Sequence, residues 1–199
     1  MLQDLDGNRV PPANGDSLPF TQPRGLKRVM AAKFRFFHRA HVHASVEVAW
    51  GVFTDHERIG EFTNTPMRII KPGSPERNGL GCVRRLGAFD WQVDEIVNIW
   101  RPFQVYGYHI IDNQMIDAHQ GVVRFFRTAE GGCEWVYDMQ NIPNQKALDQ
   151  ARGAGVSYQD FLGIAFKEYM SDLEAECERR ADAERVPALP PTTTITTLG

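Results

Sequence analysis

The sequence predicts an α+β fold: a seven-stranded, curved antiparallel sheet that grips one long C-terminal helix, with two short helices after the first strand. Strand-like runs rich in β-branched and aromatic residues recur from residue 34 to residue 139, separated by Gly, Pro, Asn and Asp. Short connections between the last six runs favour an antiparallel meander. A long amphipathic run follows them, and only this run is long enough to cover the apolar face of such a sheet.

The first strand and the two short helices are predicted from local signals. "FRFFHRAHVHA" (34–44) is typical of a strand and ends at Ser45, which we expect to cap a helix over 45–53. Glu47 then lies near the positive end of that helix. "TDHE" (54–57) has the spacing of a capping box and predicts that the second short helix begins there.

Six more strands follow, and turn residues such as Pro72-Gly73 separate them. After the last strand we expect a pliable loop over 144–157, because Gly153 and Gly155 lie within it. This loop is either a gate over a cavity or an ordinary connection. The six predicted strands are "MRIIKPG", "GCVRRLGA", "DWQVDEIVNIW", "QVYGYHIID", "GVVRFFRT" and "CEWVYDM".

The final helix is predicted to begin at Ser157, which forms an N-terminal cap with Asp160, and to end near Glu184. Apolar residues recur along one face of it, as expected for a helix that packs against a sheet. These residues are Leu162, Phe166, Tyr169, Leu173 and Cys177.

Composition indicates one soluble domain. The chain has 199 residues, 42% hydrophobic and 24% charged, and its net charge of −3 gives no general attraction to nucleic acid or anionic membranes. It contains no apolar run of about 18 residues, so no membrane-spanning helix is predicted. The first residues lack the apolar core of a secretory signal, so we expect a cytoplasmic protein. We expect an ordered domain over 34–184 and disordered tails over 1–33 and 185–199.

Three histidines in "HRAHVH" are the densest group of metal-ligating side chains: His38, His41 and His43. Strand alternation places His41 and His43 on the solvent face, and two such residues supply too few ligands for a metal. The three cysteines form no CxxC pair, and we predict no metal and no cofactor. His38 faces inward, as a cavity residue or as a hydrogen-bonded core histidine.

Four stretches together resemble the START-like helix-grip superfamily, also called SRPBCC, in its polyketide cyclase/dehydrase and lipid-transport branch. The similarity covers about residues 42–180. The stretches are "VHASVEVAWGVFTD" (42–55), "GLGCVRRL" (79–86), "DEIVNIWRP" (94–102) with "YGY" (106–108), and "GGCEWVYDM" (131–139). This chain has Cys133 where the family often has Thr, and Trp135 and Tyr137 where it often has one apolar and one aromatic residue.

The resemblance implies a cavity between the sheet and the last helix for an apolar or amphipathic small molecule. It does not imply one reaction, because the family includes polyketide cyclases, dehydratases, lipid carriers and receptors. We therefore expect a binding module for a lipid or a polyketide-like molecule. A cyclase or dehydratase that uses acid–base side chains in the cavity is the alternative, and an adaptor that binds a protein partner is the third hypothesis.

Glu95 is the first candidate for acid–base chemistry. It shares a predicted strand face with Val97 and Ile99, and burial among apolar neighbours raises the pKa of a carboxyl group. Arg84 on the adjacent strand is the expected partner, whereas Arg85 faces the other way. The pair is either catalytic or structural.

Further candidates lie on neighbouring strands. His119 shares a predicted face with Asp117 and, with a tyrosine, forms a proton-transfer set unless it faces solvent. His38 and Tyr137 complete the catalytic candidates. The predicted cavity lining is Phe36, Arg84, Val97, Ile99, Tyr106, Tyr108, Trp135, Met139, Phe166, Tyr169 and Met170.

Overall fold

A computed structural model describes residues 33–87 and 92–185. Seven antiparallel strands form one sheet in the order β1-β7-β6-β5-β4-β3-β2. The meander from β2 to β7 and the pairing of β1 with β7 agree with the predicted α+β helix-grip architecture. The strands are β1 (Phe34–Val42), β2 (Met67–Lys71), β3 (Val83–Leu86), β4 (Val93–Arg101), β5 (Val105–Ile111), β6 (Ile116–Arg127) and β7 (Cys133–Pro143).

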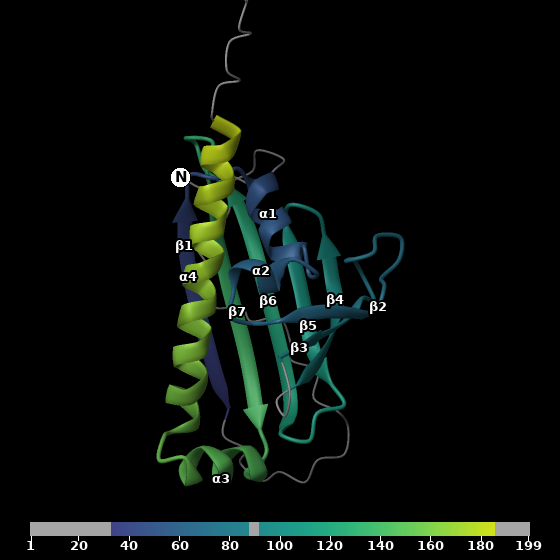
Figure 1. The fold of residues 1–199 in the computed structure, drawn as a ribbon, viewed down its shortest axis with the longest axis vertical. Helices are drawn as coiled ribbons and strands as arrows, with labels where there is room; N and C mark the ends of the chain where they lie inside the picture. The colour runs from purple at the N-terminus through teal and green to yellow at the C-terminus, as the bar shows by residue number, and fades with distance from the viewer. Residues whose placement is uncertain (1–32, 88–91, 186–199) are drawn as a thin grey trace, which may run out of the picture.

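The helices α1 (Val46–Thr54), α2 (Ile59–Phe62) and α4 (Tyr158–Arg185) lie on one face of the sheet, which we call the inner face (Figure 1). α4 begins as predicted, because the Ser157 hydroxyl accepts a hydrogen bond from the Asp160 amide at 3.0 Å. Its buried side chains include Met170, Leu173 and Cys177. No helix of the described residues is long and apolar enough to cross a membrane.

The caps of the short helices are partly as predicted. Ser45 caps α1 by accepting from the Val48 amide. The predicted capping box at 54–57 is wrong, because the Thr54 hydroxyl donates back to the Trp50 carbonyl at 2.8 Å and closes α1 instead. α2 begins after Arg58, whose side chain makes no cap hydrogen bond.

The predicted loop over 144–157 is mostly a helix, α3 (Gln145–Gly153). Asn144 caps it by accepting from the Ala147 amide at 3.2 Å. Gly155 has a φ of 75°, in the left-handed region that favours glycine, and makes the tight connection from α3 to α4. The two glycines therefore lie at the end of a helix.

The apolar core lies under α1 and the C-terminal half of α4. Phe53 of α1 packs edge-on against Phe125 of β6 and Trp135 of β7, with ring centroids 5.3 and 5.1 Å apart. Trp50 packs against Trp100 of β4 at 4.9 Å. This half of the inner face is closed by aromatic packing, and the other half, beside the N-terminal half of α4, is where polar groups gather.

Candidate functional site

A buried ion pair joins β3 to β4 on the inner face. Arg84 and Glu95 are directly opposite in the strand register, and Nε and Nη2 of Arg84 both donate to Oε2 of Glu95, at 2.9 and 2.7 Å. Only 2% of Arg84 and 4% of Glu95 is exposed. The predicted pair is therefore present and fully removed from water.

Four aromatic rings form a row next to this pair. His56, Tyr106, Tyr108 and His119 follow one another with centroid separations of 5.7, 5.6 and 5.4 Å. We call these four residues the aromatic row. The guanidinium of Arg84 lies over two of the rings, 4.4 Å from the centroid of Tyr108 and 5.3 Å from that of Tyr106.

Gly121 on β6 makes room for the row. A Cβ atom at this position would lie 2.6 Å from Cζ of Tyr108, so only glycine lets the ring lie across the strand. The Tyr108 hydroxyl contacts the Tyr137 hydroxyl of β7. The Tyr137 ring stacks on Phe166 of α4 at 5.1 Å, and Phe166 also packs against Phe36 of β1 at 5.7 Å. These contacts connect the row to the helix.

Several buried polar atoms of this region have no hydrogen-bond partner among the described residues. Three of them belong to the aromatic row, Nε2 of His56, the hydroxyl of Tyr106 and Nδ1 of His119, and two others, Nε1 of Trp100 and of Trp135, lie in the aromatic core. Buried polar groups in proteins are nearly always hydrogen-bonded. The three atoms of the aromatic row belong to neighbouring rings, and such a group is typical of a site that holds polar groups of a ligand or ordered water.

Burial shifts the pKa values of the titratable groups in the ion pair and the aromatic row. Burial lowers the pKa of His119 to about 3 and that of His56 well below its usual range, so both rings are neutral at physiological pH. Burial also raises the pKa of Glu95, and the charge and hydrogen bonds of Arg84 oppose that rise. On α4, burial raises the pKa of Tyr169 to about 12.

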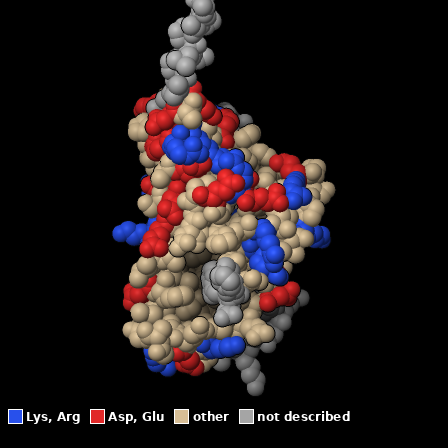
Figure 2. All heavy atoms as spheres, in the orientation of Figure 1, with Lys and Arg blue, Asp and Glu red and all other residues tan. Residues whose placement is uncertain are grey.

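A hollow opens beside this region. Figure 2 shows the molecular surface hollowed next to the N-terminal half of α4 and below α2, with mostly uncharged atoms around it. Phe166 and Tyr169 lie on that half of α4 and are partly buried. The exposed side chains Phe161 and Ile164 belong to the same stretch of helix, which is therefore apolar on more than one face.

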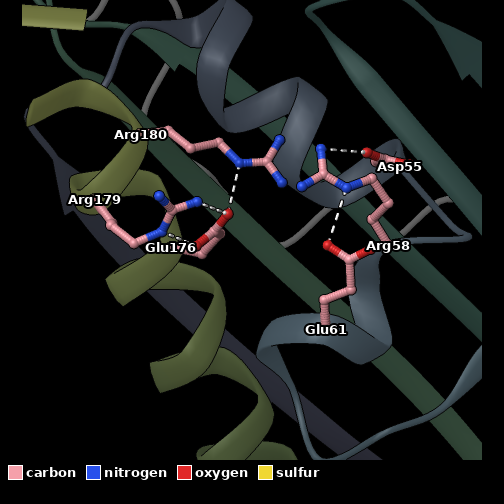
Figure 3. Close-up of polar contacts among 6 residues, drawn as sticks. All are labelled: Asp55, Arg58, Glu61, Glu176, Arg179 and Arg180. Carbon is pink, nitrogen blue, oxygen red and sulfur yellow. Dashed lines mark hydrogen bonds and ion pairs between the residues drawn. The ribbon is translucent and has the colours of Figure 1, made fainter. Parts of the chain in front are cut away.

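An ionic cluster lies where α4 meets α2 (Figure 3). Glu176 accepts hydrogen bonds from Arg179 and Arg180, and these bonds, chiefly that of Arg179, lower its pKa to about 2. Arg180 reaches from α4 over the ring of Phe62 on α2, 5.6 Å from its centroid. Figure 3 shows Arg58 on the facing segment, between Asp55 and Glu61.

The histidines of β1 lie as the alternation predicted, with one difference. His41 is exposed, and His38 faces inward, where Nε2 lies 2.7 Å from Oε1 of Glu174 on α4. His43 is also exposed, but its amide and ring bind Glu178 of α4, because β1 ends at Val42 and the alternation ends with it. The described residues contain no group of three or more side chains arranged to hold a metal ion.

Two expected positions are wrong because the strands contain bulges. A register shift between Val97 and Ile99 places Ile99 opposite Gly107, on the outer face, and Trp100 takes the inward position. A second shift, between Ile116 and Ala118, separates Asp117, which is exposed, from His119, which is buried.

The remaining predicted lining residues divide between the two halves of the inner face. Val97, Tyr106 and Tyr108 lie on β4 and β5, beside the ion pair, whereas Met139 of β7 lies farther along the sheet, half-buried opposite Gly121. Trp135 and Met170 are fully buried in the apolar core.

Sequence reasoning missed His56. It lies in the turn after α1, is 0% exposed, and its Nδ1 is 3.7 Å from Sγ of Cys82. Only the packing of this turn against β3 buries it, and that is a long-range contact with no local signal.

No protein-family model matches the chain, and no curated protein matches it. Its fold is similar to that of a solved structure, the di-domain ARO/CYC BexL from the BE-7585A biosynthetic pathway, with a TM-score of 0.58 and 16% identity. The similarity covers 79% of this chain and 51% of BexL, so this chain spans about half the length of that protein. At 16% identity, the similarity to BexL supports the fold alone.

Proposed function

We propose that this protein binds a hydrophobic or amphipathic small molecule, lipid-like or polyketide-like, in a cavity between the sheet and the N-terminal half of α4. The observation that carries the proposal is the contrast within the inner face. One half is a closed aromatic core, whereas the other holds a buried ion pair and the aromatic row, whose two histidines and Tyr106 each have an unpartnered polar atom. Largely apolar walls with a few convergent polar groups are typical of ligand sites.

The structural similarity supports the same proposal. BexL is a di-domain ARO/CYC protein from a biosynthetic pathway. A shared helix-grip architecture provides a concave sheet opposite a long helix, and the site-specific residues of this chain would determine what that space accepts.

The direct test is native mass spectrometry of freshly purified protein, compared with its mass under denaturing conditions. We expect an additional non-covalent mass that disappears on denaturation, and extraction then identifies the molecule. The protein is also titrated with a fatty acid, a sterol and an aromatic polyketide. Absence of any bound mass together with absence of binding across this panel would overturn the proposal.

Cyclase-type or dehydratase-type catalysis is the second candidate. The contact between the hydroxyls of Tyr108 and Tyr137, beside His119, favours it, because a tyrosine pair can pass a proton to a bound carbonyl. Three features favour binding instead. The pKa of His119, about 3, prevents it from acting as a general acid near neutral pH, and Glu95 is held by two hydrogen bonds from Arg84. His38 is occupied by Glu174.

Catalysis is tested with the variant Y137F. If the protein converts a polyketide substrate through this pair, Y137F loses turnover while it retains ligand binding. Unchanged substrate in the presence of wild-type protein, measured by mass spectrometry, would exclude this candidate and leave the binding proposal intact.

A further inference from the structure

We propose that Glu95 determines ligand specificity: by occupying Arg84, it makes the cavity accept neutral ligands that carry hydroxyl or carbonyl oxygens and reject carboxylates. This inference rests on the proposed binding function and goes beyond it by assigning the charge class of the ligand.

The first argument is the sum of charges. Arg84 is permanently protonated and Glu95 provides one negative charge within hydrogen-bond distance, so the pair is neutral as a unit. His56 and His119 are neutral because burial disfavours their protonated forms. A carboxylate placed here would add an uncompensated charge to a buried site, which is strongly unfavourable.

The second argument is the geometry of the guanidinium. Arginine binds carboxylates through a fork of parallel N–H groups, and the Nε and Nη2 groups of Arg84 are both directed to Oε2 of Glu95. The flat face of the guanidinium is covered by the rings of Tyr106 and Tyr108. Arg84 therefore supports the aromatic wall, and its strongest anion-binding edge is already used.

The third argument is what remains unpartnered. The Tyr106 hydroxyl donates or accepts a hydrogen bond, and Nε2 of His56 and Nδ1 of His119 each do one or the other, depending on the tautomer of the neutral ring. These atoms complement alcohols, phenols and ketones. None of them provides the positive charge that a carboxylate requires.

The test uses two probes of nearly equal size, 2-naphthol, which is neutral near neutral pH, and 2-naphthoate, which is anionic there. Isothermal titration of the full-length protein is expected to show that wild type binds 2-naphthol at least about tenfold more tightly than 2-naphthoate. In E95Q, which frees the charge of Arg84 with little change in shape, 2-naphthoate is expected to bind as tightly as 2-naphthol or more tightly.

The matched control is D94N. Asp94 is the neighbour of Glu95 on the same strand and pairs with Arg85 at 2.6 Å, at the adjacent register position and on the opposite face. D94N therefore removes one carboxylate from the same two strands without touching the cavity, and it is expected to retain the wild-type preference.

The outcomes separate the two proposals. If wild type binds 2-naphthoate as tightly as 2-naphthol, or if folded E95Q keeps the wild-type preference, the specificity assignment is overturned while small-molecule binding stands. If wild type binds neither probe nor any member of the wider panel, the binding function itself is overturned. The wild-type comparison needs no variant, and equal binding of the two probes overturns the assignment even if E95Q does not fold.

Discussion

Two ion pairs join β3 to β4 at adjacent register positions and face opposite ways. Arg84–Glu95 and Arg85–Asp94 have similar bond lengths, 2.7 and 2.6 Å, but the side chains of the first are 3% and 6% exposed and those of the second 32% and 24%. The alternation of a strand is the only cause of this difference. Identical chemistry is thus present once in the interior and once at the surface of the same two strands.

The difference teaches what to expect of each pair. A surface pair contributes little, because water and salt screen its charges. A buried pair must overcome a large desolvation cost, and apolar residues of similar volume would often stabilise the fold equally well. The inner pair is therefore better explained by the chemistry it provides to the cavity than by stability.

The largest expected effect is that of R84M. It leaves the Glu95 carboxylate buried without a partner, and we expect a loss of about 3–5 kcal/mol in the free energy of unfolding. R85M, at the adjacent surface position, is expected to lose less than about 1 kcal/mol. Urea denaturation measures both, and equal losses would show that the two pairs do not differ as described.

The next effect concerns two glycines on opposite faces beside the aromatic row. In G121A the new Cβ meets the ring of Tyr108 at 2.6 Å, and we expect a loss of about 1–3 kcal/mol because that ring is fixed. In G107A the new Cβ meets the Ile99 side chain at 2.9 and 3.1 Å and the Gly121 carbonyl oxygen at 3.2 Å, contacts longer than those of G121A, and the loss should be smaller. Thermal unfolding compares the two, and a greater loss in G107A would contradict the tight inner packing.

The ion pair of Glu176 with Arg179 is intermediate in burial between the two pairs of β3 and β4. The Glu176 side chain is 6% exposed but that of its partner Arg179 is 64% exposed, so we expect E176Q to lose about 1–2 kcal/mol. The hydrogen bond from Arg179 lowers the pKa of Glu176 from 4.5 to about 2, so its stabilisation is complete above pH 4.5 and disappears as the pH falls towards 2. Unfolding measured across this range should show the wild type and E176Q converging at low pH; a constant difference would contradict the assignment.

The smallest expected effect is that of D94N. Loss of the exposed pair with Arg85 should change the free energy of unfolding by less than about 1 kcal/mol, and this difference should shrink further in high salt. Denaturation at two salt concentrations checks this. A large, salt-independent loss would place the outer pair in the same class as the inner one.

The sequence was sufficient for the strand order of the meander, the long helix and the inward pair of Arg84 and Glu95, because each follows from a regular period of two or 3.6 residues. It failed where that period is interrupted. The bulges that turn Ile99 outward and separate Asp117 from His119 add one residue to a strand and leave no clear local signal.

Two other differences have separate causes. Asn144 is a good helix cap, but the sequence alone does not distinguish a flexible loop from a helix that ends at Gly153 and Gly155, and the structure shows the helix α3. His56 was missed because a turn far from β3 in sequence buries it against Cys82.

The most direct test of the central claim is an NMR titration of protein with isotope-labelled tyrosine rings, using 2-naphthol as the ligand. The chain has five tyrosines. Four of them belong to the aromatic row or to the buried region around it: Tyr106, Tyr108, Tyr137 and Tyr169. Tyr158 packs against Phe34 in a separate apolar cluster beside α3 and serves as an internal control. We predict saturable shifts of the four signals with Tyr158 unchanged. Shifts at Tyr158 alone, or no saturable shift at the other four, would contradict the account.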